Sequence, residues 1–173
     1  MRRPVILSNR LLAVIFLILG GVSHGQAQEV VVTADSWRVV DGDTIHLAEH
    51  KIRLLGIDAP EIKQQCETAD GNLWPCGKMA RDMLEGLLES GGRGIACVIS
   101  KKDRYQRDLG RCYTGSVDGG MDVQQILIRA GFAVSEYGKE YLQDEQIAAA
   151  QRRGMWAGHF LRPKEWRKAQ RGG

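Results

Sequence analysis

The stretch RLLGIDAPE, residues 53–61, joins a strand-like apolar run to charged residues at both ends. Leu54 and Ile57 suit the packed face of a sheet, and Arg53 alternates onto the other face. Asp58 and Glu61 fall just past the strand, beyond which a proline prevents the hydrogen-bonded ladder from continuing. Because an unpaired buried charge is costly, the charges are either ordinary loop residues or face each other across a group that needs them.

The stretch ends a series of three segments that are rich in β-branched residues and separated by short polar turns. Residues 29–40, 43–49 and 51–57 are therefore predicted to form consecutive antiparallel strands. Two more strands are predicted at residues 94–100 and 109–115, on either side of the charged turn KKDRYQRD.

Helical spacing of apolar residues predicts a helix over residues 75–90, which follows a proline and stops at a pair of glycines. Shorter helices are predicted at 122–131 and 145–154. This order of elements predicts an α+β fold, a five-stranded OB-fold β-barrel with three packed α-helices. We expect the domain to span residues 28–163 and to be followed by a basic flexible tail over 164–173.

The N-terminal residues 1–27 have the layout of a secretory signal peptide, with three arginines before the apolar run 11–22 and small residues before an expected cleavage site after Ala27. The run is short for a membrane span. We expect export, to the periplasm or the medium, with membrane attachment only through this segment if it is not removed.

The net charge of +3 is accounted for by this segment, which has no acidic residue, so the remaining chain is about neutral. Overall charge therefore gives no argument for nucleic-acid binding. The C-terminal region 151–173 gives such an argument, because it holds seven basic residues and one acidic residue. A solvated basic end is the alternative interpretation.

The cysteines at positions 66, 76, 97 and 112 form an even set, which indicates disulfides in an oxidising compartment. Of the three possible pairings we favour Cys66–Cys76 with Cys97–Cys112, because each joins nearby segments. A zinc site is the competing interpretation, and the absence of a C-x-x-C pair disfavours it.

A pair of carboxylates is predicted at the open end of the hairpin made by strands 43–49 and 51–57. Asp43 follows an Asp-Gly dipeptide, which also reads as an ordinary turn, and Asp58 follows the second strand. Two carboxylates that lie close together repel each other unless a cation lies between them. Oxygen ligands without histidine or cysteine favour Ca²⁺ or Mg²⁺ over zinc.

A phosphate site is predicted beside these carboxylates. The segment Asp103–Arg107 reads as a charged hairpin turn, yet guanidinium groups match the anionic oxygens of a phosphodiester. Arg53 and Arg107 are therefore candidates to hold one phosphate from two sides. Glu61 is the candidate to position or deprotonate a water molecule for in-line attack.

Taken together, these segments resemble the staphylococcal nuclease, or thermonuclease, family, in an exported and cysteine-containing bacterial branch. The matching pieces are VVDGDTI, RLLGIDAPE, DRYQR, LIRAGFA and AAAQRRGMW, which extend from Val39 to Trp156. The resemblance implies an OB-fold barrel with three helices. It also implies a Ca²⁺-dependent nuclease that acts on DNA and RNA and leaves 3′-phosphates.

The resemblance assigns roles by position. It implies metal ligation by Asp43, Asp58 and the carbonyl of Ala59, catalysis by Arg53, Glu61 and Arg107, and substrate contact by Tyr137. Tyr105 is a further candidate for substrate contact, as a ring on which a base stacks. The chain departs from the family after Glu61, where a cysteine-bounded segment replaces a lysine-rich loop.

The function expected from the sequence is a monomeric, metal-dependent phosphodiesterase that hydrolyses DNA and/or RNA, without a stable protein partner. The alternative is a catalytically inactive OB-fold protein that binds single-stranded nucleic acid. Glu61 argues against it, because a carboxylate beside a phosphate weakens binding. A third interpretation is a structural or protein-binding module whose charges are solvated turn residues.

Overall fold

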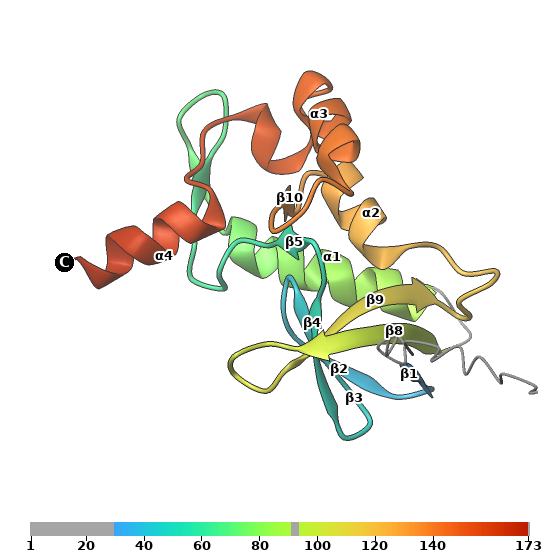
Figure 1. The fold of residues 1–173 in the computed structure, drawn as a ribbon. Helices are drawn as coiled ribbons and strands as arrows, with labels where there is room; N and C mark the ends of the chain where they lie inside the picture. The colour runs from blue at the N-terminus through green and yellow to red at the C-terminus, as the bar shows by residue number, and fades with distance from the viewer. Residues whose placement is uncertain (1–29, 91–93, 173) are drawn as a thin grey trace, which may run out of the picture.

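The computed structural model describes residues 30–90 and 94–172 and is built on one six-stranded sheet (Figure 1). The predicted signal peptide lies outside the described residues. The strands of the sheet are β1 (Val30–Ala34), β2 (Trp37–Asp41), β3 (Thr44–Leu47), β4 (His50–Leu54), β8 (Ile95–Lys102) and β9 (Asp108–Thr114). They lie in the order β1-β8-β9-β4-β3-β2, and of these pairs only β4–β9 is parallel.

The sheet curls because its two outer strands follow each other in the chain. The segment expected as one strand is divided at Asp35-Ser36, two residues with low strand propensity, into β1 and β2. β1 pairs with β8 and β2 pairs with β3, so the two edges of the sheet are held next to each other. The α+β class and the OB-type arrangement are thereby confirmed.

The structure contains two short strand pairs that were not predicted from the sequence. β5 (Ile57–Asp58) pairs with β10 (Val134–Ser135), and β6 (Cys66–Glu67) pairs with β7 (Leu73–Trp74). β5 begins at the last residue of the predicted strand 51–57 and includes Asp58, which was expected just past it; a turn at Leu55-Gly56 separates β5 from β4. Gly56 has a φ of 83°, a conformation that favours glycine. The opening stretch therefore bends in its middle.

The three predicted helices are present as α1 (Cys76–Ser90), α2 (Val123–Arg129) and α3 (Leu142–Ala150), and a 3₁₀ turn, η1 (Gly154–Ala157), follows them. A fourth helix, α4 (Pro163–Arg171), replaces most of the expected flexible tail. Pro163 at its first turn, a favourable position for proline, is the start signal that the sequence prediction did not use. In Figure 1, α4 lies away from the α2–α3 pair. Among the described residues, no helix has the length and apolarity to cross a membrane.

Two apolar clusters hold the fold together. The main cluster lies between the sheet and α1 and α2, and includes Ile45, Ile52, Leu84 and Leu127, all with no exposed surface. Full burial of such side chains contributes about 1.5–3 kcal/mol each. The smaller cluster surrounds Met155 and includes Cys66 and Cys76, which were predicted to form a disulfide.

Both favoured disulfides are present. Cys66–Cys76 joins β6 to the first residue of α1, and Cys97–Cys112 joins residues that face each other on β8 and β9. There is no free cysteine to form the alternative zinc site.

Candidate active site

The β3–β4 hairpin places Arg53 beside Asp43. Thr44 and Arg53 are directly opposite in the ladder, and the amide of Leu54 donates to the carbonyl of Asp43 over 2.8 Å. The side chains then meet beyond the end of β3. Nη1 of Arg53 donates to Oδ1 of Asp43 over 2.7 Å.

The turn at Leu55-Gly56 brings Asp58 back to the same guanidinium. Nη2 of Arg53 donates to Oδ1 of Asp58 over 2.8 Å. Asp43 is 3% exposed and Asp58 has no exposed surface, so neither charge is stabilised by bulk water. In this structure Arg53 thus supplies the positive charge that the two neighbouring carboxylates require.

Asp43 is held by further hydrogen bonds. Its Oδ1 accepts from the hydroxyl of Thr44 over 3.0 Å, and its Oδ2 accepts from the backbone N–H of Ala59 over 3.1 Å. Burial raises the pKa of Asp43 to about 7, although Arg53 and the Ala59 amide act in the opposite direction. A proton therefore competes with any cation for this carboxylate near neutral pH.

Arg167 of α4 joins Asp58 to Glu61. Its Nη1 lies 3.0 Å from Oδ1 of Asp58 and 2.9 Å from Oε1 of Glu61, and its Nη2 lies 2.8 Å from Oδ2 of Asp58. Hydrogen bonds to these two carboxylates raise the pKa of Arg167 above its ordinary value. The sequence prediction did not include Arg167 in the site. The basic surplus of residues 151–173 indicated the region, but no local spacing indicated the residue.

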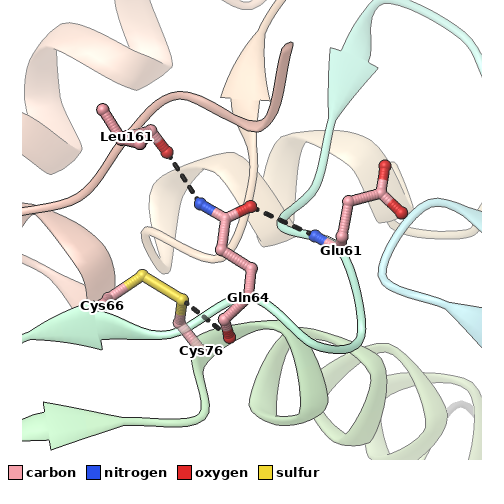
Figure 2. Close-up of a disulfide and its surroundings, with 5 residues drawn as sticks. All are labelled: Glu61, Gln64, Cys66, Cys76 and Leu161. Carbon is pink, nitrogen blue, oxygen red and sulfur yellow. Dashed lines mark hydrogen bonds between the residues drawn. A yellow bond between two sulfur atoms is a disulfide. The ribbon is translucent and has the colours of Figure 1, made fainter. Parts of the chain in front are cut away.

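The backbone of Glu61 is fixed by the buried side chain of Gln64. Figure 2 shows the amide of Gln64 between two backbone groups: its Oε1 accepts from the N–H of Glu61 over 3.3 Å, and its Nε2 donates to the carbonyl of Leu161 over 2.7 Å. The carbonyl of Gln64 accepts from Gly77, the second residue of α1, next to the Cys66–Cys76 disulfide. Gln64 thus ties Glu61 to the segment that leads into α4.

The turn between β8 and β9 presents Arg107 and Tyr105. Oδ2 of Asp103 accepts from Nε of Arg107 over 2.8 Å, and its Oδ1 accepts from the backbone amides of Tyr105 and Arg107. Burial acts to raise the pKa of Asp103, but these hydrogen bonds outweigh it and lower the pKa. The Tyr105 side chain is exposed, and its ring centre is 5.8 Å from the Arg107 guanidinium carbon.

A cavity of about 610 Å³ brings most of the predicted residues together. Its lining includes Arg53, Glu61, Tyr105, Arg107 and Tyr137. The lining also includes basic residues that the sequence prediction did not select, namely Lys101, Arg104, Arg167 and Arg171. The predicted metal ligands Asp43, Asp58 and Ala59 are buried and do not line the cavity. The two aspartates contact lining residues through guanidinium groups.

The donor set fits a hard divalent cation by its chemistry. Asp43 and Asp58 supply carboxylate oxygens, and both pair with the positive charge of Arg53. Within residues 30–90 and 94–172, no three His, Cys, Asp or Glu side chains form a metal-binding group. Ca²⁺ takes six to eight oxygen ligands. A metal here therefore needs backbone, water or substrate oxygens as well.

Comparison with known proteins identifies the family of this chain. The family model described as staphylococcal nuclease homologue matches residues 51–158. A succinoglycan biosynthesis protein, ExoI, of Rhizobium meliloti is 33% identical over 147 residues, which cover 83% of this chain and 73% of that protein. An uncharacterized endonuclease of Escherichia coli is 35% identical over 130 residues, which cover 69% of this chain and 74% of that protein.

A plant protein is also similar. The staphylococcal-like nuclease CAN1 of Arabidopsis thaliana is 30% identical over 158 residues, which cover 87% of this chain but 44% of that protein. The matched family segment contains β4, β5 and the turn that carries Arg107, together with α1, α2 and α3. This chain is a member of the staphylococcal nuclease family.

Proposed function

We propose that this protein is a Ca²⁺-dependent nuclease that hydrolyses the phosphodiester bonds of DNA and/or RNA by in-line attack of water. Family membership and the nuclease names of several relatives support a hydrolase acting on nucleic acids. The observation that carries the proposal is the cavity in which Arg53, Glu61 and Arg107 meet beside a buried pair of aspartates.

The charge of the cavity suits a polyanion. Six of its lining residues are basic and two are acidic, so a phosphodiester is attracted and a guanidinium is available on more than one side. The exposed rings of Tyr105 and Tyr137 offer surfaces on which bases stack. Base stacking tolerates every base, which is consistent with cleavage of either nucleic acid.

Each residue then has a distinct task. Arg53 and Arg107 hold the non-bridging oxygens of the phosphate and stabilise the negative charge that grows as phosphorus becomes five-coordinate. Glu61 accepts the proton of the attacking water as the new P–O bond forms. The P–O bond on the opposite side breaks, and the leaving oxygen takes up a proton from solvent. Asp43, Asp58 and the carbonyl of Ala59 would hold the Ca²⁺, which supplies further neutralisation of the phosphate oxygens when it is bound.

The place of action that we propose is outside the cytoplasm. Two disulfides support an oxidising compartment, since such bonds are rare in the cytosol. The signal-peptide layout of residues 1–27 supports the same location. We propose that the exported protein works as a monomer.

The alternative is an inactive OB-fold protein that binds single strands. The position of Glu61 in the cavity argues against this alternative, because a carboxylate beside the phosphate weakens binding.

The test is cleavage of single-stranded DNA, duplex DNA and RNA by the chain without residues 1–27, with Ca²⁺, with Mg²⁺ and with a chelator. We expect cleavage that the chelator abolishes and that Glu61→Gln and Arg107→Ala each reduce about 10²- to 10⁴-fold. Arg81→Ala is the matched control, since Arg81 pairs with Asp82 and Glu85 on the surface of α1. Absence of cleavage with every metal, while single strands still bind, would establish the alternative.

A further inference from the structure

The start of helix α4 is fixed by contacts with α3 and β10. The guanidinium of Arg162, just before the helix, donates to both carboxylate oxygens of Glu145 over 3.0 and 3.1 Å and to the carbonyl of Ser135 over 3.1 Å. The next residue, Pro163, is buried. Together with the bond from Gln64 to the carbonyl of Leu161, these contacts determine where the helix begins and thus where its side chains lie.

From this start, one residue of α4 reaches the buried carboxylates. Arg167 contacts both oxygens of Asp58 and one oxygen of Glu61. The Asp58 side chain has no exposed surface, and Arg53 also contacts its Oδ1. Both oxygens of Asp58 are therefore occupied by guanidinium nitrogens.

A metal ion on Asp58 must displace at least part of this arrangement. Two cations that share one carboxylate repel each other, and the repulsion is strong where water is largely absent. Arg167 does not have to leave the site when it leaves Asp58, because it lines the cavity that also contains Arg53 and Arg107. A substrate phosphate in that cavity offers Arg167 an anionic partner in place of Asp58.

We propose that Arg167 is an exchange residue: it competes with the divalent cation for Asp58 in the free protein and transfers to the substrate phosphate when the cation binds. This inference rests on the proposed metal-dependent nuclease function. It assigns to α4 a positioning role, which makes metal binding and phosphate binding cooperative.

The first measurement is the affinity of the exported protein for Ca²⁺ without substrate, by titration calorimetry, for wild type and Arg167→Gln. We expect the variant to bind Ca²⁺ about tenfold more tightly, because a competing positive charge is gone. The matched control is Lys168→Gln, which removes the same charge from the next residue. Lys168 is exposed and forms no ion pair with any residue in the part of the chain that the structure describes. We expect the Ca²⁺ affinity of Lys168→Gln to equal that of wild type.

The second measurement is the steady-state cleavage of a single-stranded oligonucleotide at saturating Ca²⁺. We expect the KM of Arg167→Gln to rise about tenfold, and Arg167→Lys to recover part of the loss, since it keeps the charge without the planar fork. Thermal unfolding of each variant shows whether the fold is retained.

The outcomes separate this inference from the proposed function. Unchanged or weaker Ca²⁺ affinity in Arg167→Gln overturns the competition, and an unchanged KM overturns the transfer to phosphate. If wild type binds neither Ca²⁺ nor Mg²⁺ but Arg167→Gln does, the competition is supported. If neither protein binds a divalent cation, the proposed function fails together with this inference.

Discussion

The guanidinium of Arg167 lies 2.8 Å from Oδ2 of Asp58, although 109 positions separate the two residues in the chain. The pair joins the last helix to the short strand β5, the second half of the stretch RLLGIDAPE. Arg53 also contacts Asp58, so this buried carboxylate is held by an arginine from the hairpin and an arginine from α4. The candidate active site is thus completed by the end of the chain.

Replacement of Arg53 tests whether this arginine supports both fold and activity. Arg53→Ala leaves two buried carboxylates without their shared partner, so we expect the free energy of unfolding to fall by about 3–5 kcal/mol in metal-free buffer. We expect cleavage to fall about 10²- to 10³-fold. Urea unfolding and initial cleavage rates measure the two effects.

The double variant Arg53→Ala/Asp43→Asn is the control, and it should recover part of the stability but none of the activity. An unchanged urea midpoint for Arg53→Ala would show that the ion pairs contribute nothing to stability.

Two glycines of α1 give a matched pair of substitutions. A Cβ at Gly77 would lie 1.7 Å from the carbonyl oxygen of Glu61, whereas a Cβ at Gly86 meets nothing within 4 Å. Gly77→Ala should therefore displace Glu61, destabilise the protein by several kcal/mol and reduce kcat. Gly86→Ala should stabilise it by about 0.5–1 kcal/mol, because alanine favours the helix, and leave kcat unchanged. If both variants unfold and cleave alike, the close approach of Gly77 to the carbonyl of Glu61 is not needed for stability or activity.

The two disulfides should differ in their effect on catalysis. Loss of either bridge, by replacing both of its cysteines with serine, should cost about 2–4 kcal/mol of stability. Cys66–Cys76 lies beside Gln64, which holds the backbone of Glu61, so its loss should also lower kcat. Cys97–Cys112 joins β8 to β9 and takes no part in the bonds that Glu61 makes to Gln64 and Arg167, so its loss should leave kcat unchanged. Both variants are assayed well below their unfolding temperatures, and equal kcat values would refute a link between the first bridge and Glu61.

The pH dependence of metal binding should report on Asp43. Its pKa is raised to about 7, so its carboxyl group is mostly ionised above pH 7 and mostly protonated below it. A metal must displace that proton, so the apparent Ca²⁺ affinity should be constant at high pH and fall about tenfold per pH unit below pH 7. Calorimetric titrations at pH 8, 7, 6 and 5.5 measure this. An affinity that stays level down to pH 5.5 would mean that Asp43 is not a ligand or is already ionised.

Much of the fold follows from patterns that are local in the chain. The apolar spacing of residues 76–90 and the β-branched runs around Ile45 and Ile52 were sufficient to place α1 and the hairpin, because helices and strands repeat at fixed periods. The division of residues 30–41 into two strands was missed, since it depends on which distant strand each half pairs with.

The candidate site was only partly accessible to the same reasoning. Asp43, Arg53 and Asp58 meet because a hairpin and one glycine turn bring them together, and both features are short-range. The sequence alone determined these residues and the family motifs, and it favoured one of three disulfide pairings, which the structure then showed. The tertiary structure decided that Arg53 lies between the two aspartates and that Arg167 reaches Asp58. The physical reason is that the position of α4 depends on long-range contacts of Arg162 and Gln64. The residue spacing within the helix does not indicate which distant residues make these contacts.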